Sequence, residues 1–158
     1  MRTNTEKIDS YWLNKPESNV GLYFAYGSNI NQEQMRHRCK DSKPVALAYL
    51  KNYQFIINSQ GVATIIPSAN SIVRGVLWQI SESDESQLDK YEGVSSNLYR
   101  KEICTALVND DSMKALVYVA TESSLGLPRE KYLETILHGL VSFGVSEQWI
   151  EEIKIFKQ

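Results

Sequence analysis

Two short segments of the sequence carry residue types that could do chemistry. The first, Tyr26 to Asn29 (YGSN), follows an apolar run and precedes a helix-forming stretch. Glycine lets the main chain approach a ligand, so the N–H groups of Gly27, Ser28 and Asn29 could converge on a carboxylate or phosphate oxygen, assisted by the helix N-terminus that follows. The same residues are typical of ordinary turns and helix caps. The pattern alone therefore leaves open an anion-binding turn and a plain cap.

The second segment places a glutamate at the end of an expected helix. Glu92 stands within DKYEGV, residues 89–94. A helix C-terminus disfavours negative charge, and Leu88, Tyr91 and Val94 could shield the carboxyl from water. Both effects would raise the pKa of the carboxyl group toward the range of a general base. A solvated surface carboxylate fits the same position, since most of the nineteen acidic residues must be exposed.

Other catalytic arrangements are weakly supported. Ser28 lacks a G-x-S-x-G elbow, and neither His37 nor His138 is flanked by an obvious acid to orient it, which disfavours a serine triad. The run 36–38 (RHR) favours a solvated or loop-bracing face over a phosphate site. With two cysteines, no CxxC spacing and two histidines, no metal site is expected.

Composition narrows the class of protein. The chain has 158 residues, 42% hydrophobic and 23% charged, which is typical of a folded domain. A net charge of −2 without a basic block argues against nucleic acid as a partner. No apolar run reaches the roughly 18 residues of a membrane span, and the polar start lacks a secretory signal. We expect a cytoplasmic protein with no membrane partner, folded as one domain over 1–158 with an N-terminal extension over 1–20.

The periodicity of apolar residues predicts mostly strands, with a helix inserted before the last pair of strands and further helices at the end of the chain. Helices are expected over 5–14, 31–38, 81–91, from Pro128 onward, and 147–156. Strands are expected over 22–26, 45–58, 63–66, 72–80, 99–108 and 115–120, with breaks at Gly61 and Pro67. This order indicates an α+β fold with a small mixed, highly curved β-sheet or β-barrel and flanking helices.

Four segments in the same order resemble the γ-glutamylcyclotransferase family. They are YFAYGSN at 23–29, GVATI at 61–65, GVLW at 75–78 and LDKYEGV at 88–94. PREKYLETILHG at 128–139 resembles the closing helix of the family, so the resemblance covers about residues 22–149. It implies the AIG2-like fold, shared with a butirosin-deglutamylating enzyme: a small α+β barrel with a cavity.

The resemblance also implies an activity and a set of site residues. In the family, the α-amine of a γ-glutamyl substrate attacks its own γ-amide carbonyl, which releases 5-oxoproline and an amine without a metal or cofactor. The catalytic glutamate of the family falls on Glu92. Its substrate-binding residues fall on Tyr23, Phe24, Ala25, Tyr26, Gly27, Ser28, Asn29 and Tyr132.

Three functions remain open at this point. YGSN resembles the branch that acts on γ-glutamyl amino acids and glutamyl-tagged natural products, whereas γ-glutamylamine cyclotransferases show a YGTL-like segment. A non-catalytic binding domain on the same fold is the third possibility. We expect a monomer or homodimer with a small-molecule γ-glutamyl substrate. The loops at 69–73 and 95–98 are expected to form the pocket for the leaving amine, whose identity the sequence does not indicate.

Overall fold

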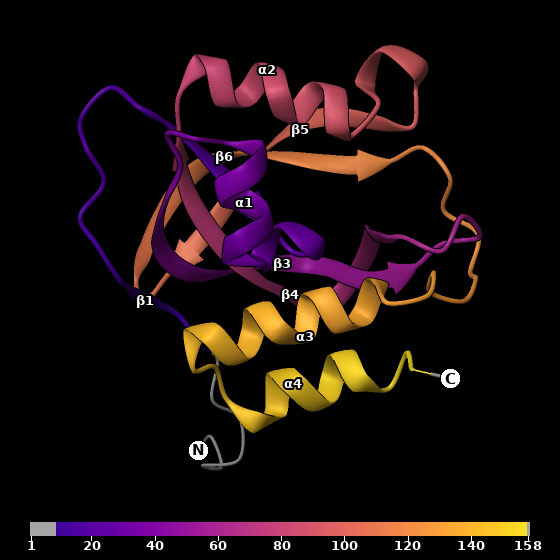
Figure 1. Ribbon diagram of the computed structural model, residues 1–158. Helices are drawn as coiled ribbons and strands as arrows, with labels where there is room; N and C mark the ends of the chain where they lie inside the picture. The colour runs from indigo at the N-terminus through magenta and orange to yellow at the C-terminus, as the bar shows by residue number, and fades with distance from the viewer. Residues whose placement is uncertain (1–8, 158) are drawn as a thin grey trace.

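The computed structural model describes residues 9–157 and contains a closed β-barrel flanked by helices (Figure 1). The strands are β1 (Tyr11–Trp12), β2 (Gly21–Ala25), β3 (Lys43–Ile57), β4 (Ala63–Ile80), β5 (Tyr99–Val108) and β6 (Asp111–Ala120). The helices are α1 (Gln32–Arg38), α2 (Glu82–Tyr91), α3 (Tyr132–Phe143) and α4 (Glu147–Lys154), with 3-10 turns η1 (Ser28–Ile30) and η2 (Val94–Ser96). The predicted fold class is confirmed.

Closure of the sheet comes from one extra strand pairing. The sheet order is β1-β3-β4-β2-β6-β5, and β3 also pairs with β5, so five strands form the barrel while β1 extends β3 at its edge. All pairs are antiparallel except β2 with β6. Irregularities in β3 at 44–46 and 51–53 add local twist, which lets the long β3–β4 hairpin wrap around the barrel.

The predicted break at Pro67 is wrong, because β4 continues through this proline. Pro67 is exposed and pairs with Tyr53 beside the irregularity at Asn52, which has a positive φ of 66°. Proline is tolerated in sheets at such irregularities because no regular ladder hydrogen bond is lost there. Two predicted strands are therefore one.

The helix predicted over 5–14 is also wrong where it can be compared. Residues 5–8 lie outside the described residues, and Tyr11–Trp12 form a strand against β3. The indole nitrogen of Trp12 donates to Asp111 at 2.9 Å, and the Leu13 amide donates to the Val45 carbonyl at 2.8 Å. The edge of β3 supplies backbone hydrogen-bond partners to this segment. The helical spacing of apolar residues within 5–14 carries no information about that edge, so the sequence alone did not predict the strand.

The helix predicted from Pro128 begins four residues later, at Tyr132. The amide of Arg129 donates to the carbonyl of Gly61 at 2.9 Å, and Lys131 has a left-handed backbone with φ of 65°. The left-handed backbone of Lys131 is incompatible with a helix that runs through 128–131. The segment instead forms a loop that lies across the end of the β3–β4 hairpin.

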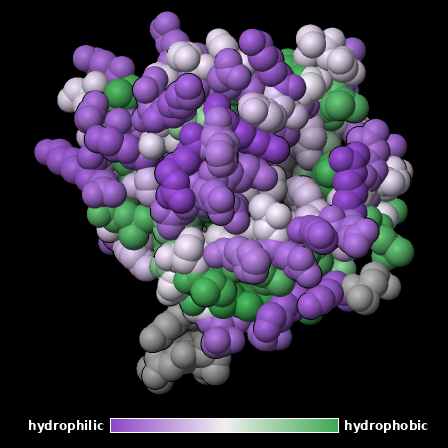
Figure 2. Space-filling view, viewed as in Figure 1, coloured by the Kyte–Doolittle hydropathy of each residue, from purple (hydrophilic) through white to green (hydrophobic). Residues whose placement is uncertain are grey.

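The helices cover different sides of the barrel. Figure 1 shows α3 and α4 side by side on one side and α2 on the opposite side, with α1 between them. Figure 2 shows mostly hydrophilic residues over α1 and α2 and a hydrophobic band over α3 and α4. The core between these layers includes Phe24, Ile30, Leu47, Leu77 and Ile136, all fully buried. The end of α2 and the start of α3 thus approach the same end of the barrel.

A capping box at Ser81 holds the start of α2, the helix that carries Glu92 at its other end. The Ser81 hydroxyl accepts from the Asp84 amide at 3.0 Å, and the Asp84 carboxylate accepts from the Ser81 amide at 3.1 Å. Ser81→Ala is expected to lower the free energy of unfolding by about 1 kcal/mol, measured by urea denaturation. Ser83→Ala, an exposed serine in the same helix, is the control. Equal losses in both variants would contradict a specific capping role.

Candidate active site

A cavity of about 280 Å³ brings the two predicted segments together. It lies between β2, η1, the end of α2 and the start of α3. Among the residues expected to bind substrate or act in catalysis, its walls include Tyr23, Phe24, Tyr26, Gly27, Ser28, Asn29, Glu92 and Tyr132. Ala25 does not line it. Residues about 65 positions apart in the sequence therefore share one cavity.

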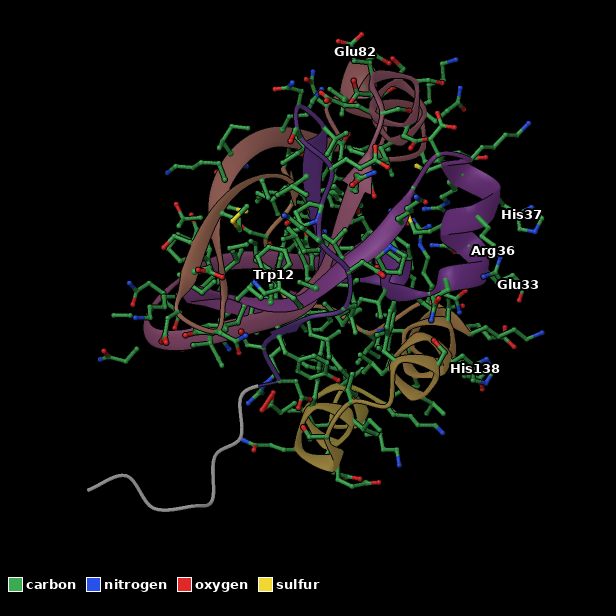
Figure 3. The ribbon with its side chains drawn as sticks, turned by 90° about the vertical axis from the view of Figure 1, so that its left-hand side faces the viewer. Trp12, Glu33, Arg36, His37, Glu82 and His138 are labelled. Atoms are coloured by element: carbon green, nitrogen blue, oxygen red, sulfur yellow. The ribbon has the colours of Figure 1, made fainter. Side chains whose placement is uncertain are left out.

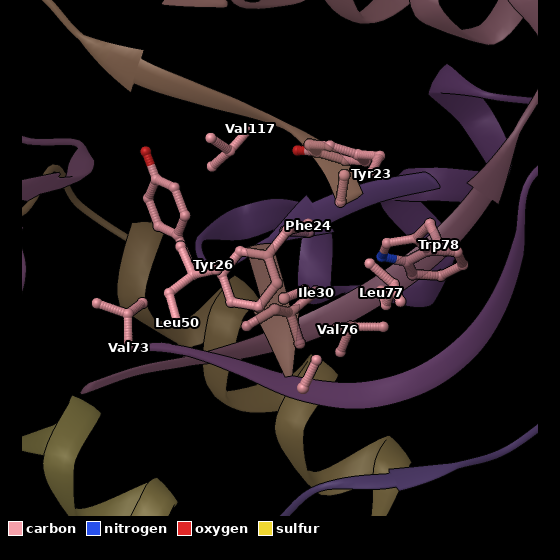
Figure 4. Close-up of a cluster of buried hydrophobic side chains, with 14 of the residues drawn as sticks. Tyr23, Phe24, Tyr26, Ile30, Leu50, Val73, Val76, Leu77, Trp78 and Val117 are labelled. Carbon is pink, nitrogen blue, oxygen red and sulfur yellow. The ribbon is translucent and has the colours of Figure 1, made fainter. Parts of the chain in front are cut away.

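The members of the YFAYGSN segment differ in how they contribute to the cavity. Tyr23 and Tyr26 project their hydroxyls to the same side of the chain, whereas the ring of Phe24 lies beside Ile30 in the core (Figure 4). Phe24 contributes to the wall of the cavity but is fully buried, and Ala25 is 1% exposed. Both residues are therefore almost inaccessible, and the two tyrosines form the polar part of this wall.

Glu92 ends α2 and borders the cavity. Its amide donates to the Leu88 carbonyl at 2.8 Å, and Gly93 follows with φ of 63°, the left-handed conformation that commonly terminates helices. Burial raises the pKa of the Glu92 carboxyl to about 7, and the nearby charge of Arg38 opposes the rise. The predicted direction of the shift is confirmed. The side chain is only partly accessible, so the carboxyl can exchange a proton near neutral pH in a sheltered environment.

The YGSN segment forms the 3-10 turn η1, capped by Gly27. The N–H groups of Ser28 and Asn29 occupy the first turn, where amides have no partner within a helix. A Cβ on Gly27 would stand 3.1 Å from the Tyr132 hydroxyl and 3.3 Å from the Cβ of Ala63. The absence of a side chain on Gly27 therefore lets the Tyr132 hydroxyl lie close to the turn without crowding.

Two phenols of the cavity accept hydrogen bonds from the protein. The Asn29 amide group donates to the Tyr23 hydroxyl at 2.9 Å, and the Ala63 N–H donates to the Tyr132 hydroxyl at 3.1 Å. Burial raises the pKa of both phenols, so both keep their protons. Each hydroxyl can therefore donate to a ligand. Tyr26 differs, because its hydroxyl already donates to the Tyr118 carbonyl at 2.6 Å.

A polar network connects the turn to the end of α2. The Asn29 side-chain oxygen accepts from Gln34 at 2.9 Å and from Arg38 at 3.1 Å. The Arg38 guanidinium lies 4.5 Å from the centre of the Tyr91 ring, next to Glu92. The sequence interpretation of 36–38 as a solvated or loop-bracing face therefore misses Arg38 as a wall residue. Its spacing of four from Gln34 on one helix is the signal that could have found it.

Several other wall residues were not predicted. They are Gln34, Arg38, Gln60, Val62, Ala63, Tyr91, Tyr99, Tyr118, Arg129 and Thr135. Of the loops expected to form the leaving-group pocket, 95–98 contributes Leu98. Residues 69–73 do not line this cavity, because 70–73 belong to β4 and border a separate hollow beside α4.

The histidines lie away from the cavity. Figure 3 shows His37 on α1 and His138 on α3 pointing outward from the barrel. Within residues 9–157, no group of three His, Cys, Asp or Glu side chains is placed to hold a metal ion. The same part of the chain contains no helix long and apolar enough to cross a bilayer.

The fold and the site define a small barrel protein that combines a proton-exchanging carboxyl with amide and phenol donors in one cavity. The chain belongs to the gamma-glutamyl cyclotransferase, AIG2-like family, whose sequence pattern matches residues 23–139. The family expected from the four segments is therefore confirmed. The matched region includes every residue proposed for the site.

Individual relatives agree with this membership. Human gamma-glutamylcyclotransferase is 29% identical over 150 residues, which cover 88% of this chain and 80% of the relative. The mouse protein of the same name is 28% identical and covers 87% and 79%. A solved structure named gamma-glutamyl cyclotransferase superposes with a TM-score of 0.79 at 28% identity, covering 86% of this chain and 87% of that one.

Proposed function

We propose that the protein is a γ-glutamylcyclotransferase that converts a γ-glutamyl amide into 5-oxoproline and a free amine, with Glu92 as the acid–base residue. The observation that carries the proposal is the placement of a carboxyl with a pKa of about 7 in the same cavity as the YGSN turn. Membership of the family and the activity named for its relatives support the same reaction.

The reaction needs little machinery because its nucleophile is part of the substrate. Glu92 takes a proton from the α-ammonium, and the resulting amine attacks the γ-carbonyl carbon to form a C–N bond. The tetrahedral intermediate then collapses, the original amide C–N bond breaks, and Glu92 returns its proton to the departing nitrogen. The ring nitrogen keeps one hydrogen as the lactam N–H, and the second proton of the former ammonium ends on the released amine, which leaves as an ammonium ion. Holding the glutamyl group folded supplies about 7 kcal/mol or more of the barrier through positioning.

The other site residues bind and orient the substrate. The N–H groups of the turn Tyr26–Asn29 hold the α-carboxylate of the glutamyl group or the oxygen that becomes negative in the intermediate. The hydroxyls of Tyr23 and Tyr132 donate to these oxygens, and donors aimed at developing charge give the largest rate gain. Phe24 and Ala25 fix the strand behind the turn. No residue role requires a metal or cofactor.

We also propose a setting for the enzyme. Residues 1–158 act as one domain, as a monomer or homodimer on a small-molecule substrate. Cys39 is buried and Cys104 is half-buried, both as free thiols, which suits the reducing cytoplasm.

A mass-spectrometric screen for 5-oxoproline tests the proposed function. The purified protein is incubated with γ-glutamyl dipeptides and with ε-(γ-glutamyl)-lysine, and turnover of dipeptides is the expected result. Preference for the lysine conjugate would favour a γ-glutamylamine enzyme. Binding of substrates without any 5-oxoproline would favour the non-catalytic domain.

The pH dependence of kcat/KM is expected to show an acid limb near pH 7. Only the carboxylate form of Glu92 can accept the ammonium proton, so activity should fall about tenfold per pH unit below the pKa of about 7. Initial rates of 5-oxoproline release from pH 5 to 9 measure this limb. Two substrates with different leaving amines should give the same limb. A limb near 4.5, the ordinary pKa of glutamate, would contradict the assignment.

A further inference from the structure

The wall of the cavity includes an arginine that the proposed reaction does not use. Arg129 lies in the loop before α3, where its amide donates to the Gly61 carbonyl at 2.9 Å and its Nε donates to the Gln60 carbonyl at 2.8 Å. A Cβ on Gly61 would stand 2.7 Å from the Cγ of Arg129, so the aliphatic stem lies directly against this glycine. The contacts of Nε and Cγ hold the side chain at the end of the β3–β4 hairpin, and the amide bond holds its backbone there.

The guanidinium of Arg129 keeps donors for a ligand. Nε bonds to Gln60, and no ion pair of Arg129 occurs among residues 9–157. The charge is felt inside the cavity, because it favours the ionised form of Tyr99, whose hydroxyl donates to the Ala63 carbonyl in the same wall. A guanidinium with its terminal N–H groups uncommitted is suited to a carboxylate, which it can bind with two parallel hydrogen bonds.

The charges of the wall indicate a substrate with two carboxylates. Arg38 and Arg129 are its two cationic side chains, and Glu92 is its single carboxyl. Arg38 is bonded to Asn29 of the YGSN turn, on the side assigned to the glutamyl carboxylate. Arg129 lies with Gln60 instead. A second carboxylate on the leaving amine would match Arg129, whereas a polyamine would place a cation against it.

The rim of the cavity adds an apolar surface. Tyr91 and Leu98 both line the cavity and remain 54% and 46% exposed. Leu98 packs over Gly93, where a Cβ would stand 2.8 Å from the Leu98 Cδ1. Two exposed apolar side chains at the mouth of a cavity can cover the hydrocarbon part of a ligand, and burial of that area favours binding.

We propose that Arg129 determines leaving-group specificity by binding the carboxylate of an α-amino acid with an apolar side chain, which packs on Leu98 and Tyr91. The proposal rests on the proposed cyclotransferase function and specifies its substrate class. The preferred substrates are therefore γ-glutamyl dipeptides with an apolar second residue.

Paired substrates that differ only in the second carboxylate test this role. γ-Glutamyl-leucine is compared with γ-glutamyl-3-methylbutylamide, which lacks that group, and with γ-glutamyl-putrescine. The parent should prefer the dipeptide in kcat/KM. Arg129→Gln should lower kcat/KM for the dipeptide about fivefold to thirtyfold and leave the methylbutylamide within about twofold, since one charge-assisted contact is lost. Arg129→Glu should improve the putrescine conjugate relative to the dipeptide.

Matched variants separate a specific contact from a general effect. Arg36→Gln removes the same charge from an exposed position outside the cavity and should leave all three substrates unchanged. Leu98→Ala should reduce the preference for γ-glutamyl-leucine over γ-glutamyl-glycine about threefold or more. An unchanged preference would overturn the apolar part of the proposal.

The outcomes also separate this proposal from the proposed function. If the parent releases 5-oxoproline equally well from the dipeptide and the methylbutylamide, or if Arg129→Gln slows both alike, Arg129 is not the specificity residue and the cyclotransferase function stands. If no γ-glutamyl compound yields 5-oxoproline, both proposals fail.

Discussion

Glu92→Gln is expected to lower kcat for 5-oxoproline release by about 10²- to 10⁴-fold. Glutamine has nearly the same shape as glutamate and can occupy the same place at the end of α2, but it cannot accept the ammonium proton or return it to the leaving nitrogen. The substrate would still be folded and held by the YGSN turn, so KM should change much less than kcat. Some acceleration should remain from positioning alone.

The control for this loss is Glu82→Gln, an identical substitution in the first turn of the same helix. Glu82 is exposed and points away from the barrel (Figure 3), so its kcat should match that of the parent. Initial rates at pH 8, where Glu92 of the parent is mostly ionised, provide the comparison. Parent-like turnover by Glu92→Gln would overturn the assignment of the acid–base residue and leave the cavity without one, because Glu92 is its single carboxyl.

The second large effect of Glu92→Gln is a gain in stability at alkaline pH. The pKa of the Glu92 carboxyl is about 7 in the folded protein, against an ordinary value of 4.5. A raised carboxyl pKa means that the folded state retains a proton that the unfolded state has lost, so the parent loses stability as pH rises from about 4.5 to 7. Glutamine removes this dependence. We expect a gain of about 1 to 3 kcal/mol at pH 8.

Denaturant unfolding at a series of pH values measures this gain. At pH 4 the carboxyl is protonated in both states, so parent and variant should have equal free energies of unfolding. The difference should grow to about pH 7 and then remain constant. A variant that is less stable than the parent at pH 8 would show that the carboxylate makes favourable contacts in the fold. Glu82→Gln should show no such pH-dependent gain.

The two segments of the candidate site can be picked out of the sequence, although each local pattern also fits a plain cap or a surface carboxylate. A glycine turn after an apolar strand and a glutamate before a helix-terminating glycine are visible as patterns, and the resemblance to a family joined them into one site. The YGSN turn and Glu92 lie in one cavity because the barrel closes, and no local sequence pattern predicts this closure. The pKa of Glu92 likewise depends on burial by residues from other elements.

The errors have a common physical cause. Tyr11–Trp12 became a strand because β3 offered an edge, and residues 128–131 form a loop in which Lys131 is left-handed and Arg129 bonds to Gly61 across the hairpin. In both cases a long-range backbone partner overrode local propensity. Arg38 and Arg129 were missed because the wall that they join is formed by residues distant in the sequence, and only Arg38 has a local signal, its spacing of four from Gln34.

The two strand pairings that close the barrel, β2 with β6 and β3 with β5, have a consequence for folding. Tyr23 pairs with Leu116 in the parallel seam between β2 and β6, and Tyr49 pairs with Leu107 where β3 meets β5. Such distant pairings carry a high entropic cost and form late when a chain folds. The cavity is lined by residues from β2, early in the chain, and from α3, late in the chain. It is therefore incomplete until both parts of the chain are in place. Enzyme activity therefore indicates that the β-barrel has closed.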